Sequence, residues 1–133
     1  MMAPLHGSSR RSPLGRAIGL GSAKEGVRHW WAQRLTALAL VPLTLWFVIA
    51  VIGLAGADRA LLVDWVRAPL PAVLLVLLLV ATFYHGALGL QVVIEDYVEN
   101  DALRLGLLIV MWLIAIVFAV RGLFAVVKLS LGA

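Results

Sequence analysis

The chain has 133 residues, of which 63% are hydrophobic and 14% charged, and its formal net charge is +4. Its mean hydropathy is +1.04, whereas a soluble domain is only about half apolar, so an ordinary soluble domain is excluded. The absence of cysteine excludes disulfides, thiolate metal sites and a cysteine nucleophile within this chain. The basic residues adjoin a membrane span and do not line a folded face, which argues against nucleic acid as a partner.

The first segment, residues 1–21, is rich in Gly, Ser, Pro and Arg and lacks an apolar face. This composition predicts a disordered basic N-terminal tail. No apolar core with a small-residue cleavage site follows the early arginines, so a cleaved secretory signal is not expected. An Arg-rich, acid-poor tail also resembles a mitochondrial transit peptide, but the poor amphipathic period disfavours that alternative.

The first span follows a helix start. Ser22 with Glu25 three residues later fits a capping box, which predicts a helix that begins at the membrane interface. The run at residues 35–57 has no charge and is long enough to cross a bilayer. We therefore expect the first span at about residues 32–57, with Pro42 as a site where the helix can kink.

Two further spans follow a connector. Residues 58–67 have a polar and an apolar edge, which predicts a short interfacial helix on the membrane surface. Pro69 suits the first turn of a new helix, and the second span is expected at about residues 69–97. The third span, at about residues 102–128, contains Arg121, whose long side chain can extend toward the nearer interface.

The predicted fold class is thus an all-α membrane protein, with three transmembrane helices in one anchor domain, residues 22–133. Six of the 11 Lys and Arg residues precede the uncharged run at residues 35–57, and basic segments stay on the inner side of a membrane. The N-terminus is therefore expected inside and the C-terminus outside. The expected location is the bacterial inner (cytoplasmic) membrane, crossed several times, with the lipid bilayer as a partner.

The second span carries the chemistry. Between residues 68 and 94 the only titratable side chains are Tyr84 and His85, and an ionisable group inside a span is a functional candidate. At about 100° per residue, Gly89 and Asp96 point within roughly 40° of the direction of His85.

A planar macrocycle needs a face of this kind. The imidazole of His85 can supply a nitrogen to haem iron, while Gly86 and Gly89 let the ring plane approach the backbone. Asp96 lies about 16 Å from His85 along the helix axis, outside ligand range and near the membrane surface. Tyr97 is turned about 120° from His85, toward a neighbouring helix.

The phenol of Tyr97 and the carboxylate of Asp96 suit a quinone headgroup at the membrane rim. A quinone needs hydrogen-bond donors at its carbonyls and a supply of protons on reduction, while its tail needs lipid. A site at the edge of the hydrocarbon layer satisfies both needs.

Plainer interpretations stay open at this point. An isolated intramembrane histidine is often a packing residue that is hydrogen-bonded to a neighbouring helix. Asp96 and Tyr97 are also ordinary interfacial residues, and His29 and Arg34 are most simply topology and interface residues. Six-coordinate haem needs a second axial ligand, and the chain has no second mid-membrane histidine, so a partner chain would have to supply it.

The segment HGALGLQVVIEDYV resembles the second-helix motif of the hydrophobic membrane anchor subunits of succinate dehydrogenase, the D subunits of respiratory complex II. The matching residues are His85, Gly89, Gln91, Asp96 and Tyr97. The stretch SAKEGVRHWWAQRLTALALVPL looks like the alphaproteobacterial and mitochondrial type of this family. The resemblance covers roughly residues 21–127.

This resemblance implies specific roles. A sister C-type anchor subunit and this chain would hold one haem b between them, with His85 as one axial ligand of the iron and the sister chain giving the other. Tyr97 would bond a ubiquinone carbonyl with Asp96 in support, and Arg34 would be an electrostatic partner on the side of the haem propionates and the quinone.

The same resemblance implies a larger enzyme. A flavoprotein subunit and an iron–sulfur subunit would dock on the inner face, and the assembly would pass electrons from succinate to ubiquinone in the respiratory chain and the tricarboxylic acid cycle. The chain alone is then not an enzyme, in keeping with its lack of a Rossmann glycine fingerprint and of Cys ligands.

Two other functions are weighed against this one. A non-redox membrane scaffold or transporter component would use His85 for packing or proton relay, and would need neither haem nor ubiquinone. A cytochrome subunit of a fumarate reductase would share the motif, because the chain does not encode the direction of catalysis.

Overall fold

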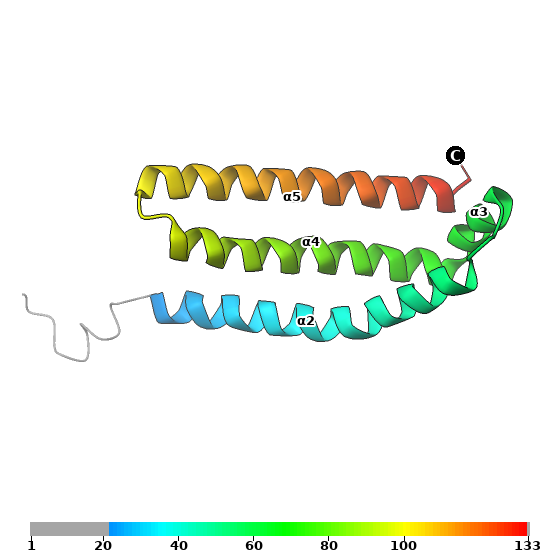
Figure 1. The fold of residues 1–133 in the computed structure, drawn as a ribbon, viewed down its shortest axis with the longest axis horizontal. Helices are drawn as coiled ribbons and strands as arrows, with labels where there is room; N and C mark the ends of the chain where they lie inside the picture. The colour runs from blue at the N-terminus through cyan, green and yellow to red at the C-terminus, as the bar shows by residue number, and fades with distance from the viewer. Residues whose placement is uncertain (1–21, 133) are drawn as a thin grey trace, which may run out of the picture.

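The computed structural model describes residues 22–132, which form four helices and no strand (Figure 1). The helices are α2 (Ser22–Gly53), α3 (Arg59–Arg67), α4 (Pro69–Tyr97) and α5 (Asp101–Ser130). Three of them, α2, α4 and α5, are long and apolar enough to cross a membrane. The predicted all-α fold with three spans is confirmed, and the chain is a multi-pass membrane protein. The tail predicted at residues 1–21 lies outside the described residues.

The three long helices lie side by side with α4 in the middle (Figure 1). Helix α4 packs against both α2 and α5, whereas α2 and α5 do not contact each other. Only Ala87, Leu88 and Met111 are buried among the described residues, all in α4 or α5. Most apolar side chains of this layer are therefore exposed on its surface.

Helix α2 differs in length from the predicted first span. It runs without a break from Ser22, so the interfacial segment and the span form one helix. It ends at Gly53 and not at residue 57, because the chain turns over the next residues and Gly56 adopts φ +81°, a conformation that favours glycine. Pro42 lies inside α2, and beyond it the helix bends toward α3 (Figure 1), as expected where a proline removes a backbone hydrogen bond.

The predicted connector is helical. The side chain of Asp58 caps α3 by accepting a hydrogen bond of 2.8 Å from the backbone N–H of Leu61. Trp65 of α3 stacks on Trp46 of α2, with ring centroids 5.8 Å apart and planes 17° from parallel. This stack fastens the end of the first span to the short helix that leads into the second.

Helix α4 begins at Pro69, as predicted, and a proline suits this first position because its missing N–H has no partner there. The connection to α5 is short. The side chain of Asn100 caps α5 by accepting a hydrogen bond of 3.0 Å from the N–H of Leu103. Because the connection is short, α5 runs back antiparallel to α4 (Figure 1).

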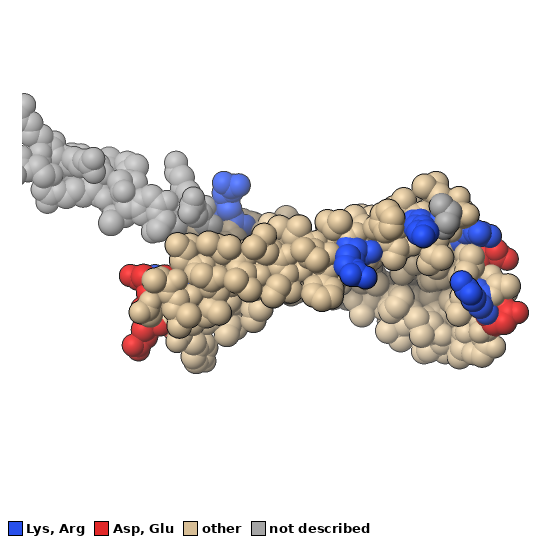
Figure 2. Space-filling view, turned by 90° about the horizontal axis from the view of Figure 1, so that it is seen from above, with Lys and Arg blue, Asp and Glu red and all other residues tan. Residues whose placement is uncertain are grey.

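Charge lies mainly near the two ends of the molecule, and the surface between them is mostly uncharged (Figure 2). The beginning of α2, the end of α4 and the beginning of α5 lie at the same end (Figure 1). The basic residues Arg28 and Arg34 thus share this end with the acidic segment from Glu95 to Asp101, as the sequence predicts.

Gly122 allows α5 to approach α4 closely. A Cβ atom added there would lie 3.2 Å from Cδ1 of Leu79 in α4, whereas one added at Gly106, also in α5, would meet no atom within 4 Å. Small residues at such contacts let membrane helices pack closely.

We therefore expect Gly122→Val to push α5 away from α4 and to lower stability by about 1–3 kcal/mol, the usual cost of overpacking. The measurement is the thermal unfolding temperature of the detergent-purified protein with its partners. Gly106→Val is the matched control, since both changes add the same side chain to the same helix. Equal unfolding temperatures for the two variants would contradict the close contact.

Candidate functional site

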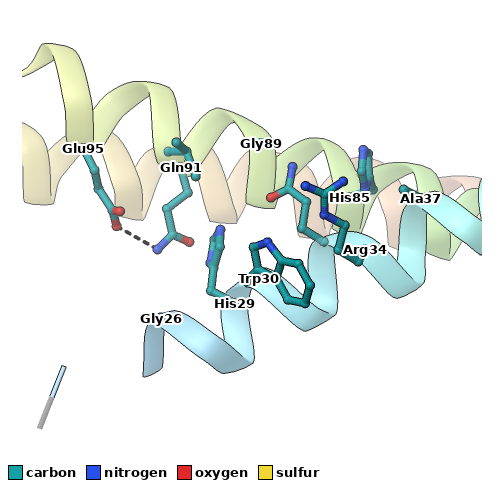
Figure 3. A pocket seen from close by; sticks show the side chains of 11 residues that line it. Gly26, His29, Trp30, Arg34, Ala37, His85, Gly89, Gln91 and Glu95 are labelled. Atoms are coloured by element: carbon teal, nitrogen blue, oxygen red, sulfur yellow. Dashed lines mark hydrogen bonds between the residues drawn. The ribbon is translucent and has the colours of Figure 1, made fainter. Parts of the chain in front are cut away.

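A cavity of about 1000 Å³ lies between the first half of α2 and the second half of α4 (Figure 3). Its wall combines polar and apolar side chains near the end of the molecule that carries the acidic segment. The residues that line it are Gly26, His29, Trp30, Gln33, Arg34 and Ala37 from α2 and His85, Gly89, Gln91, Val92 and Glu95 from α4.

His85 is half-buried at the deep end of this cavity. Its Nδ1 atom lies 2.9 Å from the hydroxyl oxygen of Thr36 in α2, within hydrogen-bond distance. Its Nε2 atom makes no hydrogen bond to any side chain or backbone group of residues 26–132. The ring is thus held through one nitrogen while the other stays available to a ligand.

The helix face predicted around His85 is formed in part. His85, Gly89 and Val92 line the cavity together, as the 3.6-residue period predicts. A Cβ atom at Gly89 would meet only Nε2 of Gln33, at 3.5 Å, so packing within this chain does not demand glycine there.

The prediction for Gly86 is wrong. Its position is turned by about 100° from that of His85, and it lines an apolar groove between α4 and α5. Only Gly89 can therefore bring a ligand in the His85 cavity close to the backbone of α4.

The mouth of the cavity is basic and aromatic on the α2 side. The guanidinium of Arg34 lies 5.4 Å from the ring centroid of Trp30, a cation–π contact. His29 lines the same cavity, and its Nε2 atom is buried without a hydrogen-bond partner among the described residues. An unpaired buried nitrogen is costly, so this part of the wall is suited to a polar or anionic group.

The sequence prediction assigned His29, a residue of this wall, only to the membrane interface. It also did not single out Thr36, which does not line the cavity but contacts His85. On the facing helix, Gln91 donates a hydrogen bond of 2.8 Å to the carboxylate of Glu95 (Figure 3). This pair places an amide and a carboxylate opposite His29.

Asp96 and Tyr97 do not line the cavity. Both are exposed, and Tyr97 is 82% exposed at the last residue of α4. Tyr97 was expected to turn toward a neighbouring helix, but it faces none of the helices in the described residues. The structure brings His85 and Arg34 to one cavity and leaves Asp96 and Tyr97 on the rim beside it.

The donor set of the cavity is small. Within residues 26–132 no three His, Cys, Asp or Glu side chains lie close enough together to hold a metal ion. An ion bound only by this chain would have few ligands, whereas a metal carried in a macrocycle needs only axial donors from protein. His85 is the donor of that kind that the cavity presents.

Comparisons with known proteins agree with one another. Residues 8–121 match the family model described as succinate dehydrogenase/fumarate reductase transmembrane subunit. A succinate dehydrogenase hydrophobic membrane anchor subunit of Rickettsia bellii is 34% identical over 87% of this chain and 93% of its own length. The protein of the same name from Paracoccus denitrificans is 31% identical over 92% of this chain and 94% of its own length.

Proposed function

Because the chain belongs to the family of succinate dehydrogenase/fumarate reductase transmembrane subunits, we propose that it anchors a succinate:quinone oxidoreductase in the bacterial inner membrane, holds one haem b together with a sister anchor subunit, and forms part of the ubiquinone-reduction site. The curated relatives bear the name of a succinate dehydrogenase membrane anchor subunit. The proposal adds the cofactor, the quinone and the roles of individual residues.

The observation that carries the proposal is the position of His85. Its imidazole stands on the wall of a cavity between two spans, bound through Nδ1 and unbound at Nε2 within the described chain. The donor chemistry fits haem iron, which takes imidazole nitrogen as an axial ligand. When bound, haem b supplies a one-electron carrier beside the quinone site.

The cavity also fits the rest of a haem. Gly89 leaves the face one turn from His85 free of side chain, and only Gln33 lies within 4 Å of where a Cβ atom would be. Arg34 and the unpaired Nε2 of His29 lie toward the end of the spans. Cationic and hydrogen-bonding groups are the partners that propionate carboxylates require.

One chain supplies half of this arrangement. A single imidazole leaves the second axial position to a partner, and the outward-facing apolar side chains of the three spans call for partner helices as well as lipid. The chain has no cysteine for iron–sulfur clusters. A flavoprotein and an iron–sulfur subunit would therefore carry succinate oxidation and dock on the inner face, beside the acidic segment.

Tyr97 and Asp96 are proposed to meet the quinone. The phenol of Tyr97 would donate a hydrogen bond to a quinone carbonyl, and the neighbouring Asp96 carboxylate would support it. Both side chains are exposed at the end of α4, where a headgroup could reach water-borne protons while its tail stays in lipid. Partner subunits would complete the walls of this site.

A packing role for His85 has one observation in its favour. The contact with Thr36 joins α2 to α4, and such a bond alone would justify an intramembrane histidine. A non-redox scaffold would need nothing more. Haem content separates the two functions, because only the anchor proposed here makes it depend on His85.

We expect His85→Ala to abolish the b-type absorption spectrum of the purified complex, because the iron loses an axial ligand. Thr82→Ala is the matched control, since Thr82 lies one turn away on α4 and lines the other groove. The measurement is the reduced-minus-oxidised spectrum per mole of assembled complex. An unchanged spectrum in His85→Ala would show that the ligand is another residue.

We expect Tyr97→Phe to lower the succinate–ubiquinone reductase rate about 2- to 10-fold, the effect of losing one hydrogen bond worth roughly 0.5–1.5 kcal/mol. Succinate oxidation with a water-soluble artificial acceptor should stay unchanged, because it does not use the quinone site. Tyr84→Phe is the control, since Tyr84 packs against Trp112 within the span, with ring centroids 6.1 Å apart. Loss of both activities in Tyr97→Phe would indicate misassembly and contradict a specific quinone contact.

A further inference from the structure

The contact between Thr36 and His85 bears on which nitrogen of the imidazole ring carries the hydrogen. The hydroxyl oxygen of Thr36 lies 2.9 Å from Nδ1 of His85. It also lies 2.8 Å from the backbone oxygen of Ala32 and 3.1 Å from that of Gln33, both one turn earlier in α2. Three polar atoms therefore surround one hydroxyl group.

A hydroxyl has one hydrogen to donate and two lone pairs that accept. Carbonyl oxygens only accept, so the contacts to Ala32 and Gln33 are hydrogen bonds when the hydroxyl hydrogen points at the backbone, a common arrangement for threonine in membrane helices. A lone pair of the hydroxyl then faces His85. Under this arrangement the ring nitrogen must donate, and Nδ1 carries the hydrogen.

The opposite tautomer satisfies fewer groups. With its hydrogen on Nε2, the ring would offer only a lone pair to Thr36, so the hydroxyl would have to leave the backbone and one hydrogen bond would be lost. The Nε2–H group would also point to a cavity in which residues 26–132 provide it no acceptor. The surroundings therefore favour hydrogen on Nδ1.

From this geometry we infer that Thr36 is a positioning residue, whose hydroxyl holds His85 in the tautomer and ring orientation that direct the lone pair of Nε2 into the cavity. The inference rests on the proposed function, in which that lone pair binds haem iron. An iron ligand must be an unprotonated ring nitrogen, and a partner on the other nitrogen fixes the tautomer and raises the basicity of the ligand.

The consequence concerns the strength of the ligand. An Nδ1–H that donates to Thr36 makes Nε2 a better electron donor, which stabilises the ferric form relative to the ferrous form. Loss of the hydroxyl should weaken haem binding and raise the midpoint potential. Partners of this kind typically change metal affinity by about 10–100-fold.

The test compares four forms of the whole complex: wild type, Thr36→Val, Thr36→Ser and Thr44→Val. Valine keeps the size and branching of threonine but removes the hydroxyl, serine keeps the hydroxyl, and Thr44 is an exposed threonine two turns further along α2. We expect Thr36→Val to lose haem about tenfold more readily during purification. We also expect its midpoint potential to rise by about 59 mV, which corresponds to a tenfold change for one electron. Thr36→Ser and Thr44→Val should keep the wild-type values.

The readouts are redox titration of the haem absorption and the g-values of the ferric haem in electron paramagnetic resonance. A packing defect alone would not give a shift in potential that is present in Thr36→Val and absent in Thr36→Ser. Should Thr36→Val fail to assemble, Thr36→Ala takes its place with the same expectation. Wild-type potential and haem retention in the variants without the hydroxyl would overturn the inference.

His85→Ala in the same series separates the two proposals. If the spectrum depends on His85 while haem retention and midpoint potential do not depend on the Thr36 hydroxyl, the positioning role alone is overturned. If the spectrum does not depend on His85 at all, the ligand assignment fails and the positioning role fails with it.

Discussion

The hydrogen bond between His85 and Thr36 is the constraint on which the arrangement of the first two spans depends. It is the only side-chain hydrogen bond that joins two helices within residues 26–132. In lipid the hydrophobic effect does not drive helices together, so close packing and polar contacts decide which faces meet. This contact fixes the rotation of α2 against α4, and that rotation turns Gln33, Arg34 and Gly89 toward one cavity.

Much of the fold could be predicted from the sequence, because membrane crossing requires long uncharged runs. The start of α4 at Pro69 follows from proline chemistry. The end of α2 could not be read from hydrophobicity, since residues 54–57 are as uncharged as the helix before them. There the backbone freedom of Gly56 decides.

The site could be predicted only as far as one helix determines it. The shared face of His85, Gly89 and Val92 follows from the helical period. The place of Gly86 in the α4–α5 groove and the exposure of Tyr97 depend on which faces of α4 the other helices cover, and hydropathy does not specify that. The roles of Thr36 and His29 likewise depend on which faces of α2 and α4 meet. A usable signal did exist, because Thr36 and His85 stand at similar distances from the common end of two antiparallel helices, and a polar side chain at that depth needs a partner.

The lack of contact between α2 and α5 has a consequence for the order in which the helices can pack during synthesis. Synthesis proceeds from the N-terminus, so α2 enters the bilayer before α4, its one neighbour in this layer, has been made. Until α4 has been synthesised, the hydroxyl of Thr36 can bond only to the backbone of α2. The hydrogen bond between Thr36 and His85 can form only after residue 85 has been synthesised, so the cavity between α2 and α4 is completed late in synthesis.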